Sequence, residues 1–261
     1  QSWGYSIREM PIAEAEEREP GVEFGSATSV SFTASDGHVD PIRVAEVCLK
    51  GIVELGGTVR IGERVTDLVI SGNMVTAVQT DHAEYSCDSV VIAAGTKTPD
   101  IAGMAGFQLE NAHSPGATVV TSRLDQPLFT SIAAMHTPRD DGGVLLNMRQ
   151  FTDGRVMIHG GTHDGSLADD SHDDAEMLLA ETKKYLPVVN ELTVEEVRRA
   201  LRPMPSDGFP VVGRLPSAPN AYVAYTHSGV TLAPMIGEMG ALEVATGAEV
   251  ELFAPYRPSR F

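Results

Sequence analysis

A stretch near the C-terminus combines the residue types that hold an electron-rich group. Residues 221–226 have the character of a strand, a turn of small residues follows, and a helix is expected over residues 234–246. Free N–H groups and the positive end of the dipole at a helix start attract negative charge above the strand end. The same pattern is also typical of an ordinary strand–turn–helix without a ligand.

The sequence patterns that would indicate a phosphate-binding loop or a metal site are weaker than this one. The chain has neither G-x-G-x-x-G nor a Walker motif, and the nearest glycine run, residues 103–106, follows no strand. His159 and His163 have the spacing of a helical metal site, but the glycines between them disfavour a helix. The acidic run 169–174 lacks the spaced ligands of a calcium loop and favours a helix start. We therefore expect no bound metal.

The elements that must position these residues follow from apolar periodicity. Asp40 and Pro41 are expected to open a helix as N-cap and first helical residue, with glycines closing it after Leu55. Strands are expected at residues 22–34, 58–61, 65–70 and 74–80, the last two forming a hairpin through Gly72. The apolar run 89–95 ends in glycine, which is typical of a parallel strand buried on both faces.

The middle of the chain has another pattern. Short β-rich pieces alternate with Asp-Gly and Pro turns, at residues 118–121, 129–134, 144–147 and 155–159. They predict an antiparallel sheet, followed by a helix over residues 171–186 and a strand over residues 194–202. The expected apolar face of that helix consists of Ala175, Leu178, Leu179, Thr182 and Leu186. The expected fold class is therefore α/β plus antiparallel β. We expect the antiparallel sheet to be inserted as a substrate domain, residues 1–34 and 108–200, into an α/β domain, residues 35–107 and 201–261.

Composition excludes several classes of function. The net charge of −17 argues against nucleic acid, because a phosphate backbone needs clustered Lys and Arg. No apolar run approaches the roughly 18 residues of a membrane span. Cys48 and Cys87 lie in apolar patterns and are expected to be reduced core residues of a cytoplasmic protein. Residues 1–21 are polar and do not start with Met, so we expect a fragment or a processed product.

Several motifs occur in a specific order: residues 36–41, 64–68, 90–95, 201–213, 222–234 and 253–261. In this combination the chain resembles the D-amino acid oxidase-like (DAO) family of FAD-dependent oxidoreductases, the group of glycine oxidase, sarcosine oxidase and D-amino acid dehydrogenase. The resemblance covers nearly the whole chain. It implies a non-covalent FAD, because neither cysteine lies near the motif that links flavin covalently in some members.

The resemblance also implies roles for individual residues. The implied cofactor-binding residues are Val65 on the adenine side, Ala94 and Gly95 against the phosphate and ribose, and Gly208, Ser228, Gly229, Val230, Thr231 and Leu232 in the flavin region. Arg202 matches the position that binds the substrate carboxylate, a task that suits its planar fork of donors, although it also fits a structural ion pair. His38, Arg149 and His227 are further candidates to line the active site, and each also fits a structural role.

The implied reaction is oxidation of the C–N bond of an amino acid or a secondary amine to an imine, by hydride transfer to flavin. The family's N-terminal βαβ unit is missing before Gln1, so we expect a partial, Rossmann-like FAD-binding domain. A second chain or an oligomer is then expected to supply or cover that segment, because an unpaired sheet edge is adhesive. Two alternatives are open: a truncated or non-catalytic subunit that needs another chain, and an FAD-dependent monooxygenase of related fold.

Overall fold

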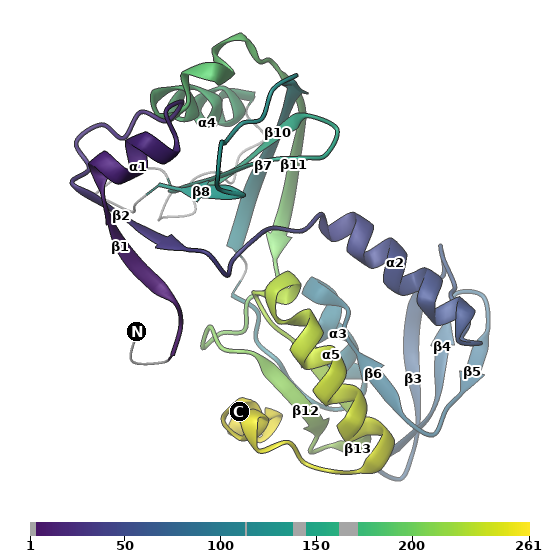
Figure 1. The fold of residues 1–261 in the computed structure, drawn as a ribbon. Coiled ribbons are helices and arrows are strands. Elements are labelled where there is room, and N and C mark those ends of the chain that lie inside the picture. The colour runs from purple at the N-terminus through teal and green to yellow at the C-terminus, as the bar shows by residue number, and fades with distance from the viewer. Residues whose placement is uncertain (1–3, 113, 138–144, 162–171) are drawn as a thin grey trace. The chain divides into compact units, whose positions relative to one another are not determined.

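A computed structural model of the chain describes residues 4–112, 114–137, 145–161 and 172–261. The chain divides into two compact units. Unit 1 comprises Gln1–Val44 and Pro115–Ala200, and unit 2 comprises Ala45–Ser114 and Leu201–Phe261. Both α/β and antiparallel elements are present (Figure 1), as the sequence predicts.

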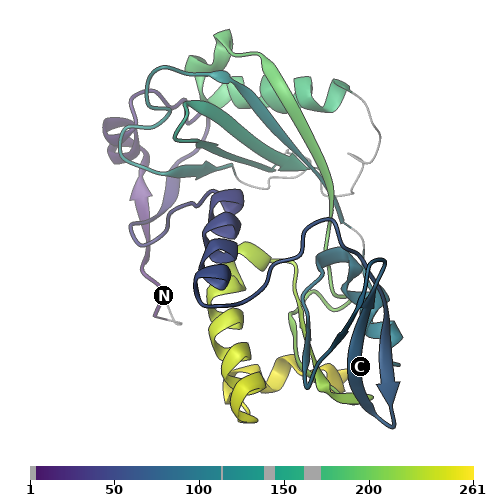
Figure 2. The same cartoon turned by 90° about the vertical axis from the view of Figure 1, so that its right-hand side faces the viewer.

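Unit 1 is built on a five-stranded sheet with the order β11-β7-β10-β9-β8. Its strands are β7 (Ser114–Arg123), β8 (Ala134–His136), β9 (Leu145–Gln150), β10 (Arg155–Gly161) and β11 (Val194–Arg202). The pairs β7–β10, β10–β9 and β9–β8 are antiparallel. Helix α4 (His172–Tyr185) lies along one face of the sheet (Figure 2). Its predicted apolar face is confirmed, since Ala175, Leu178 and Leu179 are buried against Leu146, Met148 and Ile158. The turn η2 (Pro187–Glu191) follows the helix.

A smaller part of unit 1 precedes this sheet in the sequence. Strands β1 (Ile7–Pro11) and β2 (Ser29–Thr33) form an antiparallel pair, and the short helix α1 (Ile12–Arg18) lies between them in the chain. Of the strand predicted at residues 22–34, only the C-terminal part forms, as β2. The strand predicted at residues 129–134 is wrong. There the N–H groups of Thr130, Ser131 and Ile132 donate to the buried Glu19 carboxylate instead of to a neighbouring strand.

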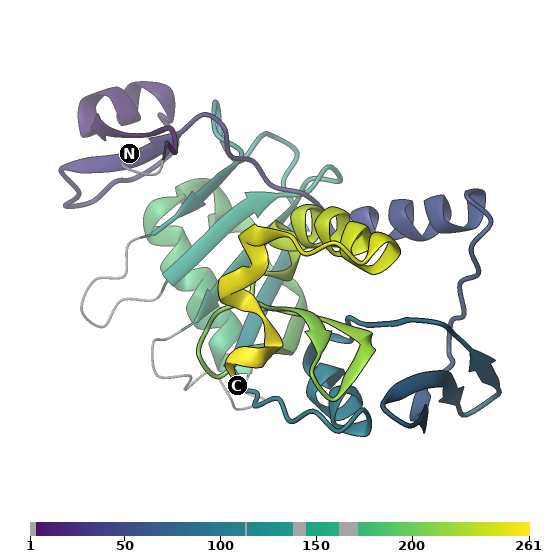
Figure 3. The ribbon, with the colours of Figure 1, turned by 90° about the horizontal axis from the view of Figure 1, so that it is seen from below.

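Unit 2 contains a three-stranded sheet with the order β12-β13-β6. Strand β13 (Ala218–Tyr225) pairs parallel with β6 (Val90–Ile92) and antiparallel with β12 (Val211–Leu215). Helix α5 (Gly229–Thr246) and the C-terminal turns η3 (Glu251–Tyr256) and η4 (Pro258–Arg260) pack beside β12 and β13 (Figure 3). After β6 come the turn η1 (Gly95–Lys97) and helix α3 (Thr98–Met104).

The predicted hairpin forms a second sheet of unit 2, from β3 (Val65–Ser71), β4 (Met74–Thr80) and β5 (Glu84–Ser86). Gly72 turns the hairpin at a φ of +63°, a conformation that favours glycine. The buried Asn220 side chain on β13 joins the two sheets: it accepts the Val75 N–H at 2.9 Å and donates to the carbonyls of Val75 and Asp88.

Helix α2 (Pro41–Glu54) begins where the sequence predicts it. Asp40 Oδ1 accepts the N–H groups of Ile42 at 2.9 Å and Arg43 at 3.3 Å, which is the expected N-cap. None of the residues of α2, all of which are described, is buried. Among the described helices, none has both the length and the apolar character that crossing a bilayer requires.

Other expectations in unit 2 need correction. Residues 58–61 form no strand, and Ile61 is 88% exposed. The run 89–95 forms a shorter strand that is not buried on both faces, because Val91 is 53% exposed. Cys48 is exposed on α2 and is not a core residue.

The last helix begins at Gly229, earlier than predicted, because Leu232 N–H already donates to the Ser228 carbonyl at 2.9 Å. Pro234 therefore lies inside α5, where it has no N–H to donate to the Val230 carbonyl.

Candidate functional site

The first group of candidate residues lies at one edge of the parallel pair in unit 2. Strands β6 and β13 run in the same direction, with Ile92 beside Val223, so the segments that follow them leave from the same edge. Ala94 and Gly95 follow β6, and Ser228 and Gly229 follow β13. Carboxyl ends of adjacent parallel strands are where open α/β sheets bind ligands. The structure thus brings together two of the cofactor-binding segments predicted from the sequence.

The start of α5 is open to ligands. Ser228, Gly229, Val230 and Thr231 are exposed, and no side chain caps the helix. The first N–H groups of a helix have no acceptor within it, and its dipole is positive there. A Cβ added to Gly229 would meet no atom within 4 Å. Leu232 is half-buried in the first turns of the helix.

The turn after β6 is also shaped for a close approach. Gly95 has a φ of +57° and no atom within 4 Å of the position of a Cβ. Thr98 Oγ1 accepts the Ala94 N–H at 3.0 Å, which fixes the backbone just before the glycine. Val65 is placed differently: it is the first residue of β3 and pairs with Thr80, in the other sheet of unit 2.

Gly208 lies in the turn that leads into β12, with a φ of +78°. Asp207 holds this turn by accepting the Phe209 N–H at 3.0 Å, and Arg260 donates to Asp207 from Nε at 2.7 Å. The Arg260 guanidinium lowers the pKa of the Asp207 carboxyl. The sequence reading missed this link, because Arg260 lies 53 positions further along the chain.

Arg202 and His227 are near each other in unit 2. Arg202 is the last residue of β11, and His227 lies between β13 and α5. Partial burial and the Arg202 guanidinium lower the pKa of His227, so its imidazole is neutral at pH 7. Two of the predicted active-site residues are thus electrostatically coupled.

The second group of candidates lies on the face of the unit 1 sheet opposite to α4. We call it the polar sheet face, and it consists of two rows of register partners. One row is His136, Asn147, His159 and Thr118, and the other is Ala134, Arg149, Met157 and Val120. In the first row, the Asn147 amide donates to His136 Nε2 at 3.1 Å, and Thr118 Oγ1 is 2.9 Å from His159 Nδ1.

Arg149 and His38, both predicted from the sequence, are coupled in unit 1. Burial lowers the pKa of His38, and Arg149 lowers it further. The pKa of His136 is also lowered, by partial burial and then by Arg149. Burial lowers the pKa of Arg149 itself, while Asp40 opposes this shift. The histidines near Arg149 are therefore neutral at pH 7, and Arg149 remains charged.

The sequence reading missed Asn147 and His136. The available signal was alternation along β9, where Asn147 and Arg149 alternate with the buried Leu146 and Met148. The metal hypothesis for His159 and His163 falls partly outside the described residues, because His163 is not among them. Within the described part of the chain, no cluster of His, Cys, Asp or Glu is placed to hold a metal ion.

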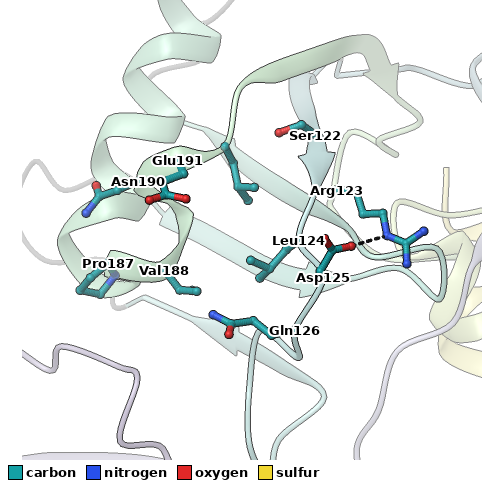
Figure 4. Close-up of a pocket in the computed structure, with 10 residues that line it drawn as sticks. Ser122, Arg123, Leu124, Asp125, Gln126, Pro187, Val188, Asn190 and Glu191 are labelled. Carbon is teal, nitrogen blue, oxygen red and sulfur yellow. Dashed lines mark ion pairs between the residues drawn. The ribbon is translucent and has the colours of Figure 1, made fainter.

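Unit 1 also has a hollow of about 830 Å³ beside the end of β7 and η2 (Figure 4). It is lined by Ser122, Arg123, Leu124, Asp125, Gln126, Pro187, Val188, Asn190, Glu191 and Leu192. Its charged pair, Arg123 and Asp125, is strongly exposed at 69% and 90% and joined at 2.9 Å. Such an exposed ion pair contributes little to stability, and each of its charges already has a partner. None of the candidate residues lines this hollow.

Unit 2 thus has a parallel strand pair that ends in exposed N–H groups, and unit 1 has a separate antiparallel sheet. The profile of the FAD dependent oxidoreductase (DAO) family matches residues 1–241. The chain therefore belongs to this family of FAD-dependent oxidoreductases, which confirms the resemblance and the FAD cofactor expected from it.

Individual relatives are distant. A subunit of opine oxidase from Agrobacterium tumefaciens is 23% identical, covering 88% of this chain and 58% of that protein. Glycine oxidase of Pseudomonas putida is 27% identical, covering 75% of this chain and 52% of that protein. The solved glycine oxidase from Geobacillus kaustophilus has a TM-score of 0.85 at 20% identity, over 100% of this chain and 68% of that one. The chain thus spans little more than half the length of these two curated relatives.

Proposed function

We propose that the protein containing this chain is an FAD-dependent enzyme that oxidises the C–N bond of an amino acid or a secondary amine to an imine. The observation that supports this most is the edge of unit 2 where the Ala94–Gly95 turn and the start of α5 follow adjacent parallel strands. FAD, when bound, supplies the acceptor for a hydride from the substrate carbon. Membership of the DAO family supports the same reaction class.

The residues at this edge fit such a cofactor. The open glycine turn at Gly95 suits a phosphate and ribose. The segment Ser228–Leu232 suits the electron-rich part of a flavin through the N–H groups at the start of α5, those of Gly229, Val230 and Thr231. In this proposal Gly208 lies in the same flavin region, and Val65 contributes on the adenine side. The cofactor is held without a covalent bond.

On the substrate side, Arg202 binds the carboxylate and orients the molecule. His227 is neutral at pH 7, so Arg202 carries the positive charge of this pair. The amine binds in its neutral form, and His38 and Arg149 line the substrate region. Positioning accounts for most of the protein's contribution, because the cofactor carries the difficult step. Water then hydrolyses the imine after it forms.

A visible absorption spectrum and anaerobic titration with amines test this proposal. Flavin bands that bleach with an amino acid or a secondary amine are the expected result. A protein that carries flavin but is reduced by no amine contradicts the proposed reaction. Bleaching by NADPH instead favours the monooxygenase alternative.

Substitution of Arg202 tests its assigned role. We expect Arg202→Ala to raise KM for a carboxylate substrate about 10- to 100-fold, because a charge-assisted pair is lost. The same variant leaves an amine without a carboxylate nearly unaffected. Steady-state kinetics with both substrates checks this, and an unchanged KM for the carboxylate substrate refutes the assignment.

One observation also favours the second candidate, a partial chain that needs another chain or segment for nucleotide binding. Leu55 is 91% exposed and Val47 on α2 is 70% exposed, although α2 has an apolar face. Two relatives, from opine oxidase and from hydrogen cyanide synthase, are named as subunits of those enzymes. Native mass spectrometry distinguishes the cases: flavin carried by this 27.8 kDa chain alone contradicts the need for a further segment.

A further inference from the structure

Asn111 connects two segments of unit 2 that are far apart in the sequence. Its Oδ1 accepts the Met204 N–H at 3.0 Å, and it also accepts the hydroxyl of Tyr225 on β13. The three residues all belong to unit 2, although 93 positions separate Asn111 from Met204 and 114 separate it from Tyr225. One side-chain oxygen thus fixes a loop and a strand at the same point. We call Asn111, Met204 and Tyr225 the Asn111 junction.

The loop side of the Asn111 junction is held by backbone contacts as well. The Ala112 N–H donates to the Met204 carbonyl at 2.9 Å, and Asn111 forms an antiparallel bridge with Pro205. Both backbone polar groups of Met204 are therefore engaged. Arg202 lies two positions before Met204, with a proline between them whose ring restricts φ. The junction thus limits where the backbone of Arg202 can lie.

The strand side of the Asn111 junction is buried. Tyr225 is buried on β13, and this burial raises the pKa of its hydroxyl, so the group keeps its proton and donates it to Asn111. His227 follows Tyr225 by two positions, just beyond the end of β13. Asn111 therefore joins the segment that carries Arg202 to the segment that carries His227. These are the two candidate residues that are electrostatically coupled in unit 2.

We propose that Asn111 and Tyr225 are positioning residues that hold the segments of Arg202 and His227 together, and so set where the Arg202 guanidinium receives a carboxylate. This inference rests on the proposed function, in which Arg202 binds the substrate carboxylate. Asn111 and Tyr225 act through Arg202 and take no part in the hydride transfer. A binding side chain is precise only when the hydrogen bonds behind it fix its place.

The first test needs neither substrate nor flavin. In the intact protein, an NMR titration of the His227 ring, assigned with His227→Gln, reports on Arg202, because the guanidinium lowers the pKa of His227. In Asn111→Ala we expect this pKa to rise towards the ordinary value of histidine, because Arg202 is no longer held near the ring. Tyr225→Phe removes one of the two hydrogen bonds to Asn111 and is expected to give a smaller rise.

The second test compares the kinetics of a carboxylate substrate with those of an amine that lacks a carboxylate. We expect Asn111→Ala to raise KM for the carboxylate substrate about 3- to 30-fold, and Tyr225→Phe about 2- to 5-fold, from the hydrogen bonds that each loses. We expect kcat, and KM for the other amine, to change less than about 3-fold, because the lost interaction serves binding of the carboxylate.

The matched control is Tyr222→Phe. Tyr222 lies on the same strand as Tyr225, three positions earlier and therefore on the opposite face, and it is also buried. Its hydroxyl donates to Glu243 at 2.7 Å. The control thus removes a comparable buried hydrogen bond away from the Asn111 junction, and we expect it to leave the pKa of His227 and both KM values unchanged.

Several outcomes contradict the proposal. One is an unchanged pKa of His227 in a folded Asn111→Ala, and another is an equal effect of Tyr222→Phe, which indicates a general loosening of unit 2. A raised pKa without a raised KM for the carboxylate substrate removes the link to carboxylate binding. Should Asn111→Ala not fold by circular dichroism, Tyr225→Phe decides, because it keeps the ring and loses one hydroxyl. If Arg202→Ala leaves KM unchanged, the proposed role of Arg202 fails, and the titration still decides whether the junction positions it.

Discussion

Units 1 and 2 differ in how completely their helices are packed. In unit 1, α4 lies along the five-stranded sheet, and its Ala175 and Leu178 are fully buried. In unit 2, most of α2 belongs to the unit and yet none of its residues is buried. Helix α5 is intermediate, with Ile236 and Glu243 buried and Val230 exposed.

This difference shows which contacts stabilise each unit. A single helix of this length is marginal in water unless an apolar face is packed, so the exposed face of α2 is a reason to expect a further packing partner for unit 2. Unit 2 is also held by polar contacts at its C-terminal end. There Glu243 accepts hydrogen bonds from Arg257, from Tyr222 at 2.7 Å and from the Val250 N–H.

The largest effect is expected from breaking that network. Glu243 is 2% exposed, and Glu243→Gln leaves the half-buried Arg257 without its counter-charge. We expect a loss of about 4 kcal/mol in the free energy of unfolding of unit 2, in the range for a broken buried ion pair. Hydrogen exchange measured by mass spectrometry, peptide by peptide, reports on each unit separately. The exposed Glu238→Gln on the same helix is the control, and an equally small effect of both variants contradicts the importance of the network.

The comparison of the helices can be tested by truncating one leucine in each unit. Leu178→Ala removes a fully buried side chain of α4 and is expected to cost about 3 kcal/mol, because it leaves a cavity. Leu55→Ala, at the end of α2, removes a side chain that is 91% exposed and is expected to cost less than about 0.5 kcal/mol. Urea denaturation of both variants measures the difference. A cost at Leu55 close to that at Leu178 means that the face of α2 is covered in solution.

Acid should weaken unit 2 through Glu243. Burial alone would raise the pKa of Glu243, but the hydrogen bonds from Arg257, Val250 N–H and Tyr222 lower it to about 2. Because the folded-state pKa lies below the unfolded value, the stabilisation is fully present above about pH 4.5 and is lost as the pH falls towards 2. We expect a loss of about 2 kcal/mol across this window. Urea titrations at several pH values check it, and Glu243→Gln should remove this component.

The sequence predicted local structure best where a short pattern of residues is compatible with only one local conformation. The N-cap at Asp40, the hairpin at Gly72 and the apolar face of α4 all follow from short-range rules. The prediction of a strand at residues 129–134 is wrong because of a contact with a distant part of the sequence. Its N–H groups bind Glu19, which is 111 positions from Thr130 in the sequence.

At the candidate site, too, short-range patterns predicted some features, and contacts between distant segments determined others. Residue types and their order marked Arg202, Gly95 and Ser228–Leu232, and family membership supports the cofactor they suit. The spacing of these segments along the sequence does not show which of them lie together in the fold. The parallel register of β6 and β13 places Ala94 and Ser228 at one edge, while Val65 lies in another sheet.

By itself, then, the sequence determined the residue types, the periodic elements and the family, because each depends on neighbours within a few positions or on a linear motif. The tertiary structure decided which groups are left without a partner. Asn147 and Arg149 look like ordinary polar residues of a strand, and their unsatisfied atoms emerge once β8, β9 and β10 are in register. Pairing and burial are set by contacts between distant segments, and a reading along the chain does not contain them.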